Sequence, residues 1–214
     1  MRRVIGRRVV ELTEEELRAL VAGAERVVLD VGTGDGRVVL RRATAEPRSL
    51  VIGLDADAAS MAEASRRAAR RPERGGLPNA CFLVLAAESL PGPLTGAADA
   101  VLVLFPWGSL LRGIVAGDEA LTNGLARLLR PGGDLTILLS LTDRDAGLGG
   151  VPAALDVETL ALARRAFLAS GLVPEPARPA TRDEVRATGS SWARRIGAGS
   201  HARPAWLLRL HRAR

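Results

Sequence analysis

The sequence predicts an α/β protein in which helices cover both faces of a mostly parallel, seven-stranded sheet. Three observations lead to this prediction. Short apolar runs alternate with amphipathic stretches along most of the chain, which is typical of successive strand–helix–strand units. The run Val27–Val31 is apolar except for Asp30, as expected of a central strand buried on both faces. Three glycines, Gly32, Gly34 and Gly36, then form the turn between this strand and the next helix.

Each further element has a local signal of its own. Residues 1–10 are basic and β-branched, and could form a hairpin. Thr13, followed by three glutamates, is a capping box that begins a helix reaching about Ala24. Another helix begins at Gly36, and the later helices are expected at Asp57–Arg71, Leu110–Leu129 with an interruption near Gly117, Val157–Ser170 and Arg182–Ala187. The later strands are expected at Leu50–Leu54, Cys81–Leu85, Ala100–Leu104, Leu135–Leu141, Leu172–Arg178 and Ala205–His211, with a turn at Arg130–Gly133.

Length and composition indicate one globular domain. The chain has 214 residues, of which 47% are hydrophobic and 25% charged, a balance found in proteins that bury a single core. We expect an N-terminal extension over residues 1–12 and substrate-binding insertions near residues 142–156 and 187–204. No apolar run is long enough for a signal peptide or a membrane span, and two histidines with one cysteine do not make a metal site. The sequence therefore favours a cytoplasmic, monomeric protein without a metal.

The glycine turn and two acidic residues predict the cofactor. Glycines at this turn let the backbone approach a ligand closely. Asp30 lies just before the turn, where a carboxylate would attract the ammonium of an amino-acid cofactor and repel a pyrophosphate. Asp55 ends the second strand, close to the spacing of an acid that binds ribose hydroxyls. Each acid alone could instead cap a helix or belong to a turn.

Together these residues resemble the pattern of class I, Rossmann-like methyltransferases, which use S-adenosylmethionine (SAM) and release S-adenosylhomocysteine. The glycine spacing differs from the G-x-G-x-x-G turn of NAD dehydrogenases. The resemblance also implies that Ala87 and Glu88, after the third strand, recognise the cofactor's adenine ring.

The end of the fourth strand predicts what accepts the methyl group. The segment Leu104–Trp107 lacks the polar residue with which many methyltransferases hold an exocyclic amine. A ring nitrogen such as N1 of adenine has an in-plane lone pair and needs no general base, so catalysis could rest on orientation. A base flipped out of a structured nucleic acid would be gripped by aromatic faces, which also stabilise positive charge.

Trp107 and Trp192 are the candidates for these two aromatic faces. Trp107 follows the fourth strand, and Trp192 lies in a Gly/Ser-rich stretch that does not resemble core. Packing under the sheet edge is the alternative for Trp107, and a local anchor is the alternative for Trp192. Trp206 lies in the last apolar run and is expected in the core.

Two sequence blocks resemble a known family. Phe105–Gly113, F-P-W-G-S-L-L-R-G, and Ser190–Arg195, S-S-W-A-R-R, are similar to the Kam-type aminoglycoside-resistance methyltransferases. Further matches cover nearly the whole chain and lie at Met1–Gly6, Leu29–Gly36, Leu54–Asp57 and Gly75–Asn79. The resemblance implies methylation of N1 of adenine 1408 in the decoding site (helix 44) of 16S rRNA in the 30S subunit, with aminoglycoside resistance as the consequence.

The resemblance also implies roles for individual residues. Trp107 and Trp192 would sandwich the flipped adenine, with Phe105 and Ser190 nearby. Contacts with SAM would come from Asp30, Gly32, Thr33, Gly34, Asp55, Ala56, Ala87, Glu88, Leu104 and Ser109.

An RNA-binding surface is indicated by the excess of arginine. The formal net charge is +6 and all 30 Lys-or-Arg positions are arginine, a side chain whose planar fork suits phosphate. Four arginines at helical spacing would form a basic ridge, for which a solvated helix face is the alternative: Arg66, Arg67, Arg70 and Arg71. The resemblance implies that this ridge docks on rRNA, and that a second patch lies beside Trp192, formed by Arg194, Arg195 and Arg203.

One departure from the family lies in this second patch. The family usually carries arginines eight and ten positions after the second tryptophan, where this chain has Ser200 and Ala202. Either the loop is shifted by one residue, so that Arg203 takes part, or RNA binding is weaker.

Two other functions remain open on the sequence alone. A small-molecule methyltransferase with the same fold would transfer the methyl group without RNA. A non-catalytic SAM-binding or RNA-binding protein would bind SAM and transfer nothing.

Overall fold

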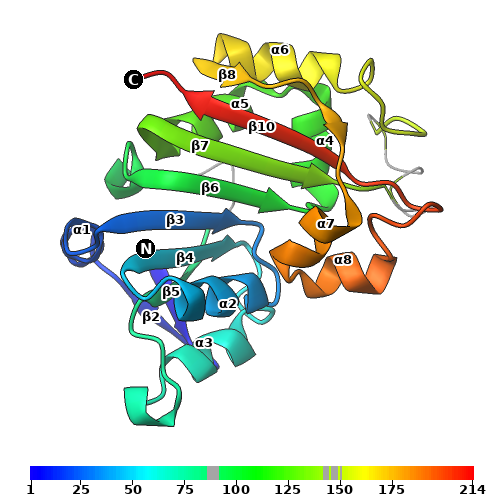
Figure 1. Cartoon of the computed structure of the whole chain (residues 1–214). Coiled ribbons are helices and arrows are strands. Elements are labelled where there is room, and N and C mark those ends of the chain that lie inside the picture. The colour runs from blue at the N-terminus through cyan, green and yellow to red at the C-terminus, as the bar shows by residue number, and fades with distance from the viewer. Residues whose placement is uncertain (86–91, 142–144, 146–148, 150) are drawn as a thin grey trace.

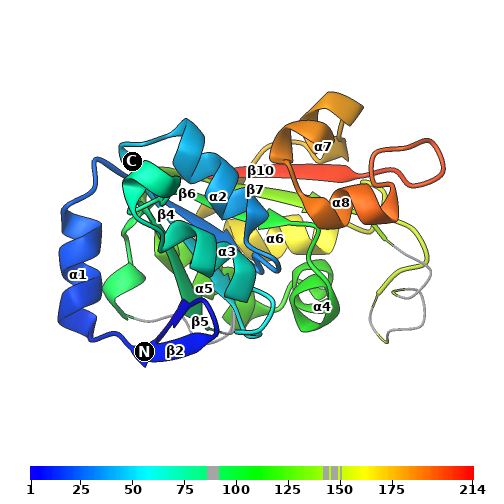
Figure 2. The same cartoon turned by 90° about the horizontal axis from the view of Figure 1, so that it is seen from below.

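The computed structural model of the protein describes residues 1–85, 92–141, 145, 149 and 151–214. In these residues ten strands form one mixed sheet. Helices lie on both faces of the sheet, as Figures 1 and 2 show. The strands are β1 (Arg2–Ile5), β2 (Arg8–Glu11), β3 (Arg26–Val31), β4 (Ser49–Asp55), β5 (Ala80–Val84), β6 (Ala98–Leu104), β7 (Leu129–Leu139), β8 (Leu172–Pro174), β9 (Arg178–Pro179) and β10 (Trp206–Arg212). The α-helices are α1 (Glu14–Ala22), α2 (Arg37–Ala45), α3 (Ala62–Ala68), α4 (Gly108–Ala116), α5 (Glu119–Leu128), α6 (Ala161–Ala169), α7 (Arg182–Thr188) and α8 (Ser191–Ile196).

Five parallel strands form the centre of the sheet, in the order β5-β4-β3-β6-β7. All of β3 after its first residue is buried, as its apolar sequence predicts. The chain passes from β3 to β4 on one side and reaches β6 on the other, so the strand order reverses at β3. Loops at the carboxyl ends of such strands diverge and leave a crevice for a ligand. The predicted fold class is confirmed. The glycine turn after β3 lies at this crevice.

The edges of the sheet are more elaborate than the seven predicted strands. The predicted N-terminal hairpin forms as β1 and β2, and β1 adds antiparallel to β5. At the other edge β10 pairs antiparallel with β7, and it also pairs with β8 and β9. A single strand over Leu172–Arg178 was expected, but prolines within and beside this segment cannot donate ladder hydrogen bonds. The described chain therefore has two short strands there, which brings the sheet to ten.

The expected turn at Arg130–Gly133 lies within β7 as a bulge. Leu129 pairs with Ala98 and Asp134 pairs with Ala100, so the residues between them accommodate a register shift in the pairing with β6. Gly132 has φ +79°, a conformation that glycine adopts without strain.

The helix expected over Asp57–Arg71 is much shorter than predicted. The Asp57 side chain accepts a hydrogen bond from the Ala59 N–H (2.9 Å), a local turn that competes with helix. The helix α3 begins only at Ala62 and ends at Ala68, and Arg71 is extended because Pro72 follows it. Arg70 and Arg71 therefore lie beyond the helix, and the prediction of a four-arginine ridge on one helix is wrong.

The other predicted helices are present with shifted ends. The interruption near Gly117 is confirmed, since this residue has φ +66° between α4 and α5. The helix expected from Val157 begins at Ala161. No helix in the described ranges is long and apolar enough to cross a lipid bilayer.

Hydrophobic cores lie on both faces of the sheet. The larger core packs α1, α4, α5 and α6 against one face, and Trp206 is buried in it as expected. A second core packs α2 and α3 against the opposite face. A third, smaller cluster places α7 and α8 over the ends of β6, β7 and β10, next to α2 (Figures 1 and 2). Its members include Phe105, Val185 and Ala193.

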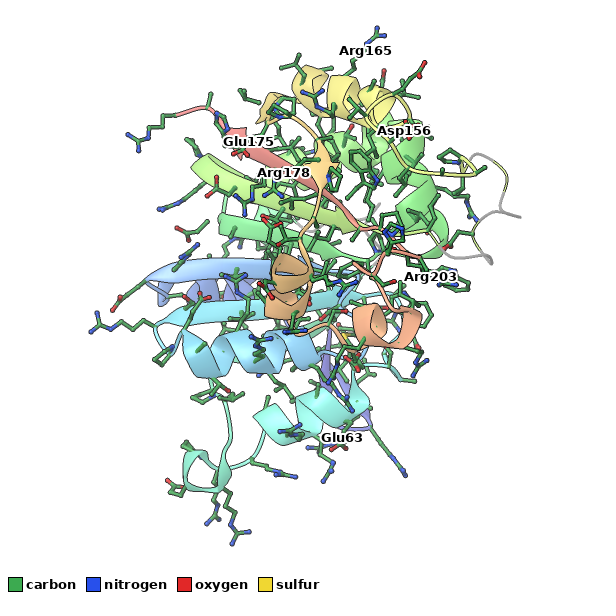
Figure 3. All side chains as sticks on the ribbon, turned by 45° about the vertical axis from the view of Figure 1, so that its right-hand side comes forward. Glu63, Asp156, Arg165, Glu175, Arg178 and Arg203 are labelled. Atoms are coloured by element: carbon green, nitrogen blue, oxygen red, sulfur yellow. The ribbon has the colours of Figure 1, made fainter. Side chains whose placement is uncertain are left out.

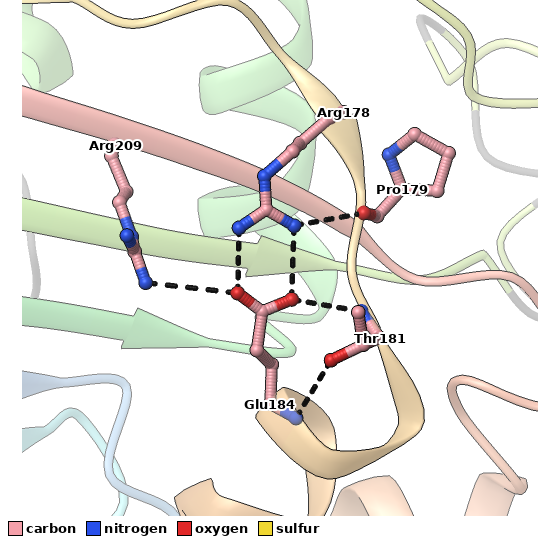
Figure 4. A network of polar contacts seen from close by, with 5 residues as sticks. All are labelled: Arg178, Pro179, Thr181, Glu184 and Arg209. Atoms are coloured by element: carbon pink, nitrogen blue, oxygen red, sulfur yellow. Dashed lines mark hydrogen bonds and ion pairs between the residues drawn. The ribbon is translucent and has the colours of Figure 1, made fainter.

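A polar network fixes the start of α7 to the sheet edge (Figure 4). Glu184 and Thr181 form a capping box at the first turn of the helix. Both oxygens of Glu184 also accept hydrogen bonds from the Arg178 guanidinium (2.6 and 2.9 Å), and Arg209 on β10 lies 3.7 Å away. Hydrogen bonds from Arg178 lower the pKa of Glu184 to about 2, so the carboxylate stays charged across the neutral range. The network therefore holds α7, and through it α8, at a fixed place beside the crevice.

Candidate active site

A pocket of about 580 Å³ opens at the carboxyl ends of β3, β4 and β6. It contains residues that the sequence assigned to two different roles. Those expected to contact the cofactor are Asp30, Gly32, Thr33, Gly34, Asp55, Ala56, Leu104 and Ser109. Those expected to contact the base are Phe105, Trp107, Ser190 and Trp192. Ala87 and Glu88, the remaining predicted cofactor contacts, lie outside the described residues.

The glycine turn leaves its ligand side open and packs closely on its other side. Gly34 has φ +56°, and a Cβ added to it would meet no atom within 4 Å. Gly36 has φ +69°, and an added Cβ would lie 2.5 Å from Cε1 of Phe82 and 2.7 Å from Cβ of Ala64. Only glycine fits at position 36 while α2 stays packed against β5 and α3. The turn is therefore rigidly placed, with its exposed backbone toward the pocket.

Asp30 brings a buried carboxylate to the pocket. This residue is only 2% exposed, and its Oδ2 accepts a hydrogen bond from the Thr33 hydroxyl (2.6 Å). Burial raises the pKa of Asp30 to about 6, against the lowering effect of the Thr33 hydrogen bond. The alternative that Asp30 caps the helix is wrong, because α2 has no side-chain cap. A buried carboxylate of this kind is stabilised by a cation in the pocket, so the site fits a ligand that carries an ammonium group.

Asp55 joins the second strand to the glycine turn. Its Oδ2 accepts a hydrogen bond from the Gly34 N–H (2.8 Å), and its Oδ1 accepts one from the Asp57 N–H (2.9 Å). The interpretation as a turn residue is thus confirmed, and the same carboxylate also lines the pocket. An acceptor at this second position fits ribose hydroxyls.

The chain turns sharply after β6 and presents Trp107 to solvent. Phe105 has φ +55°, the positive-φ non-glycine residue of the described chain, and its N–H donates to the Leu138 carbonyl (2.7 Å). The Phe105 ring is buried against α7 and α8. Trp107 is 59% exposed at the N-cap position of α4, so the alternative of packing under the sheet edge is wrong. A strained turn that exposes a large ring at a pocket mouth indicates a binding function.

The second tryptophan lies on a helix that the sequence analysis missed. Residues 187–204 were expected to be a substrate-binding insertion, and no helix was predicted there. Ser190 accepts a hydrogen bond from the Ala193 N–H (3.2 Å) and is the N-cap of α8. Gly197, at φ +68°, ends it, so a serine N-cap and a glycine C-cap were the available signals. Trp192 is half-buried beside the third cluster, and the Arg195 guanidinium lies 5.5 Å from its ring centroid. Trp192 therefore packs locally against the third cluster and also lines the pocket.

A hydrogen bond links this helix directly to the cofactor turn. The Ser191 hydroxyl donates to Oδ2 of Asp35 (2.6 Å), across 156 positions of sequence. Asp35 also accepts a hydrogen bond from the Arg37 N–H (3.2 Å). Neither Asp35 nor Ser191 was predicted as a site residue, although both line the pocket. The contact fixes α8, and with it Trp192, relative to the glycine turn.

Replacing Ser191 by alanine is expected to reduce turnover more than cofactor affinity. A hydrogen bond to a charged group contributes about 1 kcal/mol when partly exposed, so the single-turnover methylation rate should fall roughly fivefold. Calorimetry should find SAM affinity within about twofold of that of the unchanged protein. Ser191→Thr keeps a hydroxyl and should retain most of the rate. An alanine variant as fast as the unchanged protein would show that this link does not position Trp192.

The predicted RNA-binding arginines are distributed over several segments. Arg66 on α3 forms a bidentate pair with Glu63 (2.8–3.0 Å), and Glu63 is labelled in Figure 3. Arg194 and Arg195 are exposed on α8. Arg203, also labelled in Figure 3, closes a tight turn in which its N–H donates to the carbonyl (3.1 Å) and hydroxyl (3.2 Å) oxygens of Ser200.

The fold and the pocket together define the class of protein. The strand order of the parallel sheet reverses at β3, and an open glycine turn follows this strand. One buried acid precedes the turn, and a second acid ends β4. Together these features form the site of a SAM-dependent methyltransferase with the class I fold.

Comparisons with known proteins identify the family. Residues 2–211 match the family described as 16S rRNA (adenine(1408)-N(1))-methyltransferase. A protein of that name from Streptoalloteichus hindustanus is 40% identical over 92% of this chain and 93% of its own length. One from Escherichia coli is 29% identical over 91% of each chain.

Similar solved structures carry the same family name or belong to 16S rRNA methyltransferases. The 16S rRNA methyltransferase KamB superposes with a TM-score of 0.89 at 34% identity over 100% of both chains. A tryptophan-to-alanine variant of the Catenulisporales acidiphilia 16S rRNA (adenine(1408)-N(1))-methyltransferase, solved with SAM, has a TM-score of 0.86 at 33% identity and covers 100% of this chain and 97% of its own. The chain belongs to the 16S rRNA (adenine(1408)-N(1))-methyltransferase family.

Proposed function

We propose that this protein transfers the methyl group of SAM to N1 of adenine 1408 in the decoding site of 16S rRNA, within the 30S subunit, and so confers aminoglycoside resistance. The observation that carries the proposal is a single pocket that joins two kinds of group. The buried carboxylate and glycine turn form its inner part, and two tryptophans from separate segments line its mouth: Trp107 at the N-cap of α4 and Trp192 on α8. This is the arrangement needed to hold a methyl donor against a flipped base.

The cofactor side of the pocket holds the donor through charge and backbone. SAM supplies an activated methyl group on a cationic sulfur. Asp30 binds the ammonium of its amino-acid part, and Asp55 binds the ribose hydroxyls. The donor lies against the backbone of the glycine turn, at Gly32, Thr33 and Gly34. The rest of the pocket wall around it is formed by Ala56, Leu104 and Ser109. A pyrophosphate would be repelled, because the carboxylates of Asp30, Asp35 and Asp55 line the same space.

The base side works by orientation and electrostatics. Trp107 and Trp192 stack on the two faces of the flipped adenine, so that N1 points toward the methyl group. The S–CH₃ bond breaks as the N1–CH₃ bond forms, and the positive charge passes from sulfur to the base. N1 is unprotonated at neutral pH, so the step releases no proton and needs no general base. The indole faces stabilise the developing cation, while Ser190 caps α8 and Phe105 supports the turn before Trp107.

The surroundings of the pocket complete the proposal. The segment near residues 187–204 belongs to the substrate-binding surface of one domain, whose basic residues contact rRNA phosphates. The other expected insertion, near residues 142–156, lies partly outside the described residues. The enzyme acts as a monomer in the cytoplasm, where 30S subunits are found.

Methyl transfer from labelled SAM to different acceptors tests this proposal. Purified protein should label 30S subunits, and the label should be recovered in 16S rRNA. Free nucleosides and other small molecules should accept no label. Transfer to a small molecule without RNA would favour a different methyltransferase, and SAM binding without any transfer to 30S subunits would contradict an enzymatic role.

A further inference from the structure

We infer that a second groove, beside the active-site pocket, binds the phosphodiester backbone of the rRNA next to the flipped base. The groove has a volume of about 530 Å³ and crosses α2, with α3 on one side and α7 and α8 on the other. Five arginines from four helices line it: Arg37, Arg41, Arg67, Arg186 and Arg194. We call it the arginine groove. This inference rests on the proposed function, since it takes rRNA as the substrate.

The arginine groove holds positive charge that the protein itself leaves largely unneutralised. No acidic side chain is among the described residues that line it. Arg41, Arg67 and Arg194 form no ion pair in the part of the chain that the structure describes. The Arg186–Asp183 pair is long (3.9 Å), with both side chains more than 80% exposed, so water screens it. Arg37 pairs with Asp35 (3.4 Å), and that pair is also partly exposed to water. The other three guanidinium groups line the same space without an acidic partner among the described residues.

Arg41 shows how this cluster is built. Its guanidinium donates to the Arg186 backbone carbonyl (3.4 Å), and a Cβ at Gly189 would lie 2.5 Å from its Nη1. The glycine therefore leaves room for the Arg41 side chain to cross from α2 to the α7–α8 corner. Guanidinium groups held in this way can bind phosphate oxygens bidentately.

The position of the groove points to the backbone of the same RNA whose base enters the pocket. Arg194 lines the groove, while the adjacent Arg195 and the nearby Trp192 line the active-site pocket. Likewise Asp35 lines the pocket and Arg37, two positions later, lines the groove. An RNA strand that delivers a base between the two tryptophans therefore passes beside these arginines. Contacts to phosphate would fix its register, and the flipped base would supply the specificity.

The arginines of α2 and α7 are new as RNA contacts. The family resemblance assigned Arg67 and Arg194 to rRNA binding, but it did not include Arg37, Arg41 or Arg186. The fold brings these three beside the expected contacts.

The sharpest test uses Arg186, because its side chain is 82% exposed and its ion pair with Asp183 is long, so its replacement should leave the fold intact. Arg186→Gln should raise the dissociation constant for 30S subunits roughly five- to tenfold, and the slope of log Kd against log monovalent salt should fall by about 1. SAM affinity and the turnover number at saturating 30S should stay unchanged. Arg186→Lys, which keeps the charge, should retain most of the affinity. Arg165→Gln is the matched control, since Arg165 is an exposed arginine on α6, on the opposite face of the sheet (Figure 3).

Two negative results have different meanings. If the unchanged protein methylates 30S subunits but Arg186→Gln keeps its affinity and salt slope, the groove inference is overturned and the proposed function stands. If the unchanged protein neither binds nor methylates 30S subunits, the proposed function fails and the groove inference falls with it.

Discussion

Replacing Trp107 or Trp192 by alanine is expected to lower methylation of 30S subunits at least about 100-fold for each variant. Stacking of a base on an aromatic side chain contributes about 1–3 kcal/mol by alanine substitution. The same ring contributes on the order of 2 kcal/mol more when a cation develops on a base shielded from water. Trp107 is 59% exposed in the protein, so its removal should not unfold the chain, and the loss would belong to the reaction.

The readouts that separate stacking from folding are SAM binding and thermal stability. Both alanine variants should bind SAM with unchanged affinity, because neither ring is among the cofactor contacts. The Trp107→Phe and Trp192→Phe variants keep an aromatic face and should recover a substantial part of the rate. An alanine variant within threefold of the unchanged rate would refute the sandwich for that tryptophan.

Replacing Asp30 by asparagine is expected to weaken SAM binding strongly and to stabilise the ligand-free protein. Loss of a buried charge that faces an ammonium should weaken SAM binding about 100-fold or more. Burial raises the pKa of Asp30 from 3.8 to about 6, which corresponds to a cost of about 3 kcal/mol at neutral pH. Asparagine keeps an acceptor for the Thr33 hydroxyl and avoids this cost. The melting temperature at pH 7.5 should therefore rise, on the order of 5 °C.

The stabilising effect of Asp30→Asn should depend on pH. Between about pH 4 and pH 6 the folded chain holds more protons than the unfolded chain, because the folded pKa of Asp30 is the higher one. The free energy of unfolding of the unchanged protein thus falls as the pH rises through this window and is level above it. The two proteins should have similar stabilities near pH 4 and differ most above pH 6. Saturating SAM should reverse their order at neutral pH, and an asparagine variant that melts lower than the unchanged protein at pH 7.5 without SAM would contradict this account.

The centre of the fold and the cofactor side of the pocket could be predicted because their signals are local. A strand buried on both faces must be apolar, so β3 and its single acid stand out in the sequence. Glycine is required at Gly36 by close packing, and an acid before such a turn has few structural uses. These features sit within a few residues of one another, and the predicted pocket residues among the described chain do line one cavity.

The parts that could not be predicted depend on contacts distant in sequence. The bond between Asp35 and Ser191 joins residues 156 positions apart, and no periodicity reports such a pairing. The helix α8 has only six residues, too short for an apolar pattern to appear. Arg70 and Arg71 fit a helical spacing. They nevertheless lie outside α3, because a local turn at Asp57 delays the start of the helix and the proline after Arg71 prevents its continuation. The arginine groove likewise exists only once α2, α3 and α7–α8 are packed together.

Mapping the methylated position on 16S rRNA tests the central claim most directly. The protein is incubated with unmethylated 30S subunits and SAM, and the 16S rRNA is then analysed by primer extension, since a methyl group on N1 blocks base pairing. Mass spectrometry of the isolated nucleosides identifies the modified base. We predict a SAM-dependent stop at adenine 1408 with 1-methyladenosine as the product, and no stop with Trp107→Ala. A stop at another nucleotide, or a methyl group on an exocyclic amine, would contradict the account.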